Sequence, residues 1–99
     1  MDLKVRLHRR ARADLRSIRD YLIEHAGKRS ADKMRSHLLQ RIAQLSRLPL
    51  SGTATSEPGV RIFAPTRYPY RVYYVVKRSQ IVILHIRHTS RQAPDDLPS

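Results

Sequence analysis

Residues 70–91 read YRVYYVVKRSQIVILHIRHTSR, and this stretch decides the fold. Two runs of aromatic and β-branched residues, 70–76 and 81–87, are separated by the polar residues 77–80. This composition predicts two β-strands joined by a short, exposed turn. Both faces of the second run are apolar along most of its length. We therefore expect the second run to be an interior strand of a sheet whose two faces are both covered.

Side chains two residues apart share one face of a strand, so strict alternation assigns each residue of the hairpin to a face. In the second strand it places His85 on the face of Ile83, and Ile86 on the opposite face with Leu84. In the first strand it predicts one apolar face made of Tyr70, Val72, Tyr74 and Val76.

The residues before the hairpin change from a strand period to a helix period. Residues 3–8 alternate between apolar and basic side chains, which predicts a half-buried strand. Residues 9–26 repeat apolar side chains at steps of three and four, the spacing of an amphipathic helix, and Gly27 is placed to end that helix. A second apolar stripe follows, and we expect this second helix to begin at an N-cap, Ser30, and to end at Pro49.

The remaining segment predicts one more strand before the hairpin. Residues 49–59 read as a loop, residues 60–64 alternate as a strand, and residues 65–69 form a turn. The expected order is β-α-α-β-β-β in one domain over residues 1–99, with residues 92–99 as a flexible tail. This order indicates an α+β fold in which a helix hairpin packs on one face of a mostly antiparallel sheet. Two helices cover only one face, so we expect a partner to cover part of the other.

The charge balance favours acidic partners. The 99 residues include 20 Lys and Arg against 8 Asp and Glu, a net charge of +12 with a pI near 11.3. Between Glu57 and Asp95 there is no carboxylate. Such a field attracts nucleic acid, an acidic protein segment or a membrane surface. The chain has no cysteine and no apolar run of signal or membrane-spanning length, so we expect a soluble, cytoplasmic protein that does not enter a membrane.

Several kinds of site are disfavoured by the sequence. The sheet half offers no pair of carboxylates, no Gly-rich phosphate motif, and no acidic ligand beside His85 and His88, so we expect neither a metal nor a cofactor. What remains is a cationic surface carrying Tyr and His, which suits nucleic-acid binding, metal-free RNA cleavage or docking of an acidic peptide. The candidate binding residues are Arg61, Arg71, Tyr73, His85, Arg87, His88 and Arg91.

Five segments, in this order, resemble the RelE/ParE superfamily of toxins from type II toxin–antitoxin modules, and more closely its ParE-like branch. They are RRARADLRSIRDYLIEH, QLSRLP, EPGVRIFAPTRY, YRVYYVV and IVILHIRHTSR. The resemblance covers nearly the whole chain and implies the same β-α-α-β-β-β order. It also implies a cognate antitoxin with an acidic, apolar-rich tail that neutralises the toxin.

The two branches of the superfamily imply different targets. ParE-like toxins poison DNA gyrase and need no nuclease site, whereas RelE-like toxins are ribosome-dependent mRNA endoribonucleases. If the chain were such a ribonuclease, the resemblance would give the catalytic roles to Arg71, His88 and Arg91. The tail lacks a tyrosine and the third strand lacks a lysine pair, which favours inhibition of gyrase. The alternatives are the ribonuclease and a plain nucleic-acid-binding module.

Overall fold

The computed structural model describes residues 3–64 and 68–89, and in these residues it has two helices and five strands. In chain order they are β1 (Lys4–Leu7), α1 (Arg9–Ala26), α2 (Lys28–Gln44), β2 (Thr53–Ala54), β3 (Val60–Phe63), β4 (Tyr70–Val76) and β5 (Gln80–His88).

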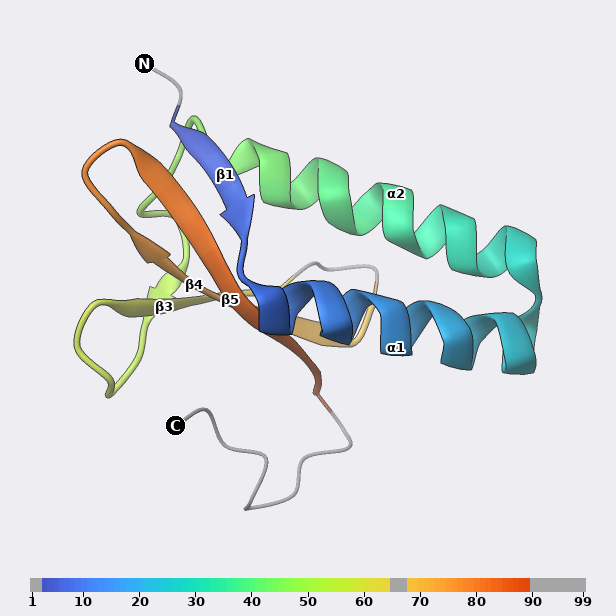
Figure 1. Cartoon of the computed structure of the whole chain (residues 1–99). Helices are drawn as coiled ribbons and strands as arrows, with labels where there is room; N and C mark the ends of the chain where they lie inside the picture. The colour runs from blue at the N-terminus through green and yellow to red at the C-terminus, as the bar shows by residue number, and fades with distance from the viewer. Residues whose placement is uncertain (1–2, 65–67, 90–99) are drawn as a thin grey trace.

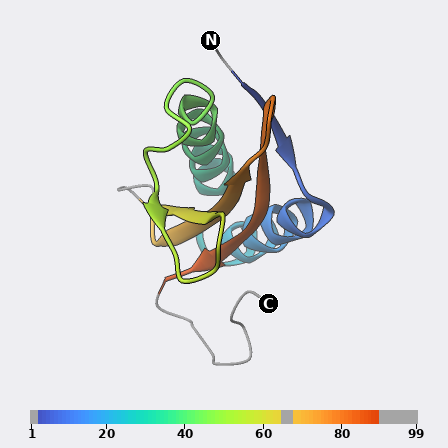
Figure 2. The ribbon, with the colours of Figure 1, turned by 90° about the vertical axis from the view of Figure 1, so that its left-hand side faces the viewer.

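The strands form one sheet in the order β1-β5-β4-β3-β2, with β1 parallel to β5 and the other neighbours antiparallel. The helices run side by side in opposite directions (Figure 1), and the strands lie in front of them when the molecule is viewed from the sheet (Figure 2). This arrangement confirms the expected α+β fold. It also confirms the interior place of the last strand, because β5 lies between β1 and β4.

The first helix has the expected bounds, but the second does not. Gly27 takes a φ of +91° and donates its N–H to the carbonyl of Ile23 at 3.1 Å, which ends α1. The prediction that Ser30 caps the second helix is wrong, because Gly27 alone links the helices and α2 begins at Lys28. The helix also ends before Pro49. The carbonyl of Ser46 accepts the N–H of Leu3, so the chain leaves the helix to meet the N-terminal segment.

The segment 49–59 is not wholly a loop, because Thr53 and Ala54 form a short edge strand, β2, on β3. Its approach to the sheet is fixed by the hydroxyl of Tyr74, which accepts the N–H of Gly52 and donates to the carbonyl of Pro49, both at 2.9 Å. A buried tyrosine hydroxyl needs such partners, and they lie in this segment. The sequence signals for a loop could not reveal a strand of two residues.

A β-bulge in β5 reverses the predicted faces of its second half. Tyr74 pairs with Ile83 but Tyr73 pairs with His85, so Leu84 is an extra residue without a partner on β4. An extra residue shifts every later side chain to the other face. His85 therefore does not share the face of Ile83, as strict alternation predicted, and Ile86 instead joins Ile83 in the core.

The core lies between the helices and one face of the sheet. The alternation correctly predicted the β4 side of it, since Tyr70, Val72 and Tyr74 are all buried there. The largest fully buried side chains of the described residues are Tyr74, Met34, Leu38, Leu45, Ile81, Ile83 and Val72. Neither helix in the described part of the chain is long and apolar enough to cross a membrane.

Candidate functional site

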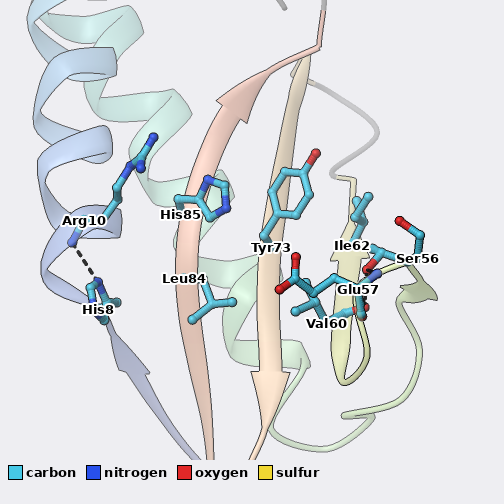
Figure 3. A pocket seen from close by; sticks show the side chains of 10 residues that line it. His8, Arg10, Ser56, Glu57, Val60, Ile62, Tyr73, Leu84 and His85 are labelled. Carbon is cyan, nitrogen blue, oxygen red and sulfur yellow. Dashed lines mark hydrogen bonds between the residues drawn. The ribbon is translucent and has the colours of Figure 1, made fainter. Parts of the chain in front are cut away.

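A groove crosses the face of the sheet that points away from the helices, which we call the open face. It has a volume of about 510 Å³ and passes over β5, β4 and β3 (Figure 3). The groove is lined by His8, Arg10, Thr55, Ser56, Glu57, Val60, Ile62, Tyr73, Leu84 and His85.

The two ends of the groove carry opposite charge. Arg10, on the first turn of α1, lies at one end together with His8, whose Nδ1 accepts the N–H of Arg10 at 3.1 Å and caps the helix. Glu57 enters the groove from the other end, on the turn between β2 and β3, and its carboxylate reaches back over β4 (Figure 3). Val60 and Leu84 are among the apolar side chains between these ends. The groove is therefore an apolar trough with a cationic end and an acidic end.

The centre of the groove is a stacked pair of rings. Tyr73 and His85 lie directly opposite each other on β4 and β5, with ring centroids 4.6 Å apart and planes inclined by 12°. Both residues are buried, although no helix covers this face, and Nδ1 of His85 has no hydrogen-bond partner. The stack thus gives the groove a flat, rigid floor.

Burial, together with the smaller effects of the nearby Arg10, Arg87 and His8, lowers the pKa of His85 to about 4. Its imidazole is therefore neutral at physiological pH. A neutral imidazole can pack against an apolar or aromatic group without the cost of burying a charge. His85 therefore suits the floor of a binding surface and adds no positive charge to it.

The turn that carries Glu57 is fixed by its own hydrogen bonds. The hydroxyl of Thr55 accepts the N–H of Glu57 at 3.1 Å and lies 2.9 Å from the carbonyl of Val60, to which it donates. The N–H of Val60 in turn donates to the carbonyl of Glu57, and Gly59 takes a φ of +80° that suits glycine. The backbone of the turn is braced in this way, and the exposed Glu57 side chain lines the groove from it.

A second carboxylate lies close to the open face. Asp14 Oδ2 on α1 accepts the N–H of Ile86 at 2.9 Å, at the part of β5 that β1 no longer covers. Burial raises the pKa of Asp14, while this hydrogen bond and the charges of Arg10 and Arg87 oppose the rise. The sequence has no carboxylate between Glu57 and Asp95, but in the folded protein Asp14 lies beside this segment.

The structure brings four of the predicted site residues to the open face. Tyr73 and His85 lie in the groove. Arg71 and Arg87 are directly opposite each other on β4 and β5, two positions further along the same face. The pair of arginines extends the surface beyond the groove and keeps it positive.

The other three predicted residues are not part of this arrangement. The guanidinium of Arg61 donates to the carbonyls of Gly52, at 2.6 Å, and Leu50, at 3.3 Å, so it braces the chain before β2. His88 pairs with Tyr70, whose ring it meets edge-on at 5.3 Å, and these two lie on the helix side of the sheet. Arg91 lies outside the described residues.

Sequence reasoning missed the two ends of the groove. Arg10 was one of many arginines around the first helix, and nothing in its spacing separated it from the others. Glu57 did carry a signal, because it is the only carboxylate between Asp32 and Asp95. Within residues 3–64 and 68–89, no three His, Asp or Glu side chains are placed to hold a metal ion.

Comparison with known proteins identifies the family. Residues 5–93 match the family described as ParE toxin of the type II toxin–antitoxin system parDE. No curated protein matches the sequence. Because the match spans nearly the whole chain, it includes the helix hairpin, the groove and the arginine pair.

Solved structures agree with this match. A chain of the chromosomal ParDE toxin–antitoxin system from P. aeruginosa is 27% identical, with a TM-score of 0.81 over 89% of this chain and 97% of that one. A chain of the toxin–antitoxin complex RelBE2 from Mycobacterium tuberculosis shares the fold, with a TM-score of 0.59 at 23% identity over 89% of this chain and 99% of that one. The chain therefore belongs to the ParE toxins of type II toxin–antitoxin systems, within the RelE/ParE superfamily.

Proposed function

We propose that this toxin stops growth by binding DNA gyrase through the open face of its sheet, and that a cognate antitoxin neutralises it by covering that face. The observation that carries the proposal is the composition of the face. An apolar trough with a stacked Tyr73–His85 floor and flanking arginines resembles the core and rim of a protein interface, where aromatic residues and arginine are enriched. A cytoplasmic site of action follows from this target.

The position of the histidines supports protein contact as the mode of action. Cleavage of RNA without a metal requires a proton-transferring group within reach of the arginines that hold the phosphate. His85 lies on the same face as Arg71 but has a pKa of about 4, far from the value suited to proton transfer at pH 7. His88 lies on the opposite side of the sheet, beside Tyr70.

The positive charge of the chain and its similarity to two solved toxin–antitoxin structures both support an antitoxin as its partner. Both solved relatives come from systems described as toxin–antitoxin. A tail with acidic and apolar residues would bury the trough and pair with the arginines around it. The apolar burial would offset the conformational entropy that the tail loses when it becomes ordered. We therefore propose a hetero-oligomer of this toxin with such an antitoxin.

The test is a pair of assays on the purified chain. Supercoiling of relaxed plasmid by gyrase should fall as the chain is added, and mRNA on translating ribosomes should remain intact. The control is a variant with Arg71 and Arg87 both changed to Glu, which reverses the charge of this half-buried pair and should inhibit gyrase at least tenfold less. Cleavage of ribosome-bound mRNA together with unaffected supercoiling would reject gyrase as the target.

The second candidate function is that of a ribosome-dependent mRNA endoribonuclease. The observation in its favour is the Arg71–Arg87 pair, because two arginines opposite each other on adjacent strands can clamp a phosphate. In that case the same two assays give the reverse result. A plain nucleic-acid-binding module would affect neither assay and would bind DNA or RNA with an affinity that falls steeply with salt.

A further inference from the structure

We infer that the groove selects a partner segment whose charge runs from acidic to basic across an apolar middle, rather than a uniformly acidic one. The inference rests on the proposed function, since the segment would be part of the antitoxin, and it adds the order of charges that the segment must carry. Two side chains of opposite charge, Arg10 and Glu57, line the groove (Figure 3).

The cationic end is ready to receive an acidic side chain. Among the described residues the ion pairs join Arg19 to Asp20 and Lys28 to Asp32, so Arg10 has no carboxylate within 4.0 Å. His8 is its neighbour at this end of the groove, and Asp14 is occupied by the N–H of Ile86. A carboxylate entering from the partner would meet a guanidinium without a competing ion pair.

The acidic end requires the opposite charge. Glu57 also makes no ion pair within the described part of the chain, although the whole sequence contains 20 Lys and Arg residues. The backbone of its turn is braced by Thr55, and its exposed side chain lines the groove. An acidic partner residue here would face a like charge, whereas Lys or Arg would form an ion pair.

The dimensions of the groove set the length of the segment. The groove crosses β5, β4 and β3, and neighbouring strands lie about 4.8 Å apart, so the floor alone spans about 10 Å. Arg10 lies beyond β5 on one side, and Glu57 reaches in from the turn next to β3 on the other. An extended chain rises about 3.3 Å per residue, so about five residues join the two ends. Alternate side chains of such a segment face the floor, which places the acid at its first position, an apolar residue at its third and the base at its fifth.

The experiment uses synthetic peptides and the full-length purified chain. Three fluorescein-labelled peptides have the central sequences Asp-Thr-Leu-Thr-Lys, Asp-Thr-Leu-Thr-Asp and Lys-Thr-Leu-Thr-Lys. The first is also made in reverse order, since the other two read the same in both directions. Their affinities are measured by fluorescence anisotropy for the wild type, for Glu57→Lys and for Glu24→Lys. The last variant changes an exposed carboxylate on α1 by the same charge, far from the groove residues, and controls for the more positive net charge.

We expect the wild type and Glu24→Lys to bind the Asp–Lys peptide, in one of its two orders, about tenfold more tightly than the Asp–Asp peptide. For Glu57→Lys this order of preference should reverse. If the Asp–Asp peptide is preferred by all three proteins, net charge alone governs binding and the inference is wrong. The same conclusion follows if no peptide binds and light scattering shows a dimer that Glu57→Lys dissociates, because a second copy then fills the groove. Peptide affinity is measured without gyrase, so its failure is distinguishable from failure of the proposed target.

Discussion

The carboxylate of Asp14 ties α1 to the bulged part of β5, and its removal tests whether that tie holds the groove in shape. The strand β1 pairs with β5 only as far as Ile83, and beyond it the N–H of Ile86 is taken up by Asp14 Oδ2 at 2.9 Å. In Asp14→Ala this N–H loses its partner in a part-buried position, which costs about 1–3 kcal/mol. The variant also removes a carboxylate whose burial is unfavourable, so we expect a net loss of about 1.5 kcal/mol.

The amide variant separates the hydrogen bond from the charge. Asp14→Asn keeps an oxygen that can accept the N–H of Ile86, and it should change the free energy of unfolding by less than about 0.5 kcal/mol at pH 7. Burial raises the pKa of Asp14, so its contribution is fully present below pH 3.8 and is lost as pH rises through the raised value. Asp14→Asn lacks this dependence and should gain on the wild type as pH rises through that range.

The assays are urea and thermal unfolding, both followed by circular dichroism, together with amide hydrogen exchange at Ile86. A loss of about 1.5 kcal/mol corresponds to a fall in Tm of roughly 6–12 °C in a domain of this size. Asp20→Ala is the matched control, because it removes an exposed carboxylate from the same helix and should change stability by less than about 0.5 kcal/mol. If the Ile86 amide exchanges equally slowly in Asp14→Ala and in the wild type, Asp14 does not hold β5.

Three further predictions concern the elements around the groove. Tyr74→Phe removes the hydroxyl bonded to Gly52 and Pro49 and should cost about 1–3 kcal/mol by urea unfolding, and unchanged stability would mean that these bonds contribute nothing. His85→Phe keeps the stack on Tyr73 and removes the titrating group. The lowered pKa gives His85 a contribution to stability that is complete above pH 6.5 and is lost on acidification towards pH 4, so over that range the wild type should lose roughly 2 kcal/mol more stability than the variant. If the stabilities of the two proteins fall in parallel with pH, the pKa of His85 is not lowered. Gly27→Ala forces a side chain into a φ of +91° and should lower the free energy of unfolding by about 1 kcal/mol, so an equal or higher Tm would contradict the single-residue link.

The spacing of apolar residues in the sequence was sufficient to predict the two helices and the hairpin. The bounds of the first helix and of β4 were correct because each apolar stripe ends at a clear signal, such as Gly27. The predicted start of the second helix was wrong, because Gly27 both ends the first helix and directly precedes the second. Serine is only statistically favoured as an N-cap, and that preference was not decisive at Ser30. The strand Thr53–Ala54 could not be predicted either, since its place depends on the distant hydroxyl of Tyr74.

The candidate site was only partly predictable, and the bulge explains why. Tyr73 and His85 were expected to bind, yet alternation put His85 on the face of Ile83. The bulge that turns His85 into the groove coincides with a hydrogen bond from Ile86 to Asp14, 72 residues earlier in the chain. No local pattern in the sequence indicates a contact between residues so far apart in the chain. For the same reason, the presence of Arg10 and Glu57 in one groove is visible only in the folded structure.

The most direct test of the account is amide hydrogen exchange on the toxin alone and in complex with its cognate antitoxin. If the open face is the binding surface, protection should rise at the turn 55–59 and along β3 and at residues 82–87 of β5, where the groove and the arginine pair lie. The outer surface of α2 should exchange as before. Protection confined to the two helices, with the open face unchanged, would contradict the account.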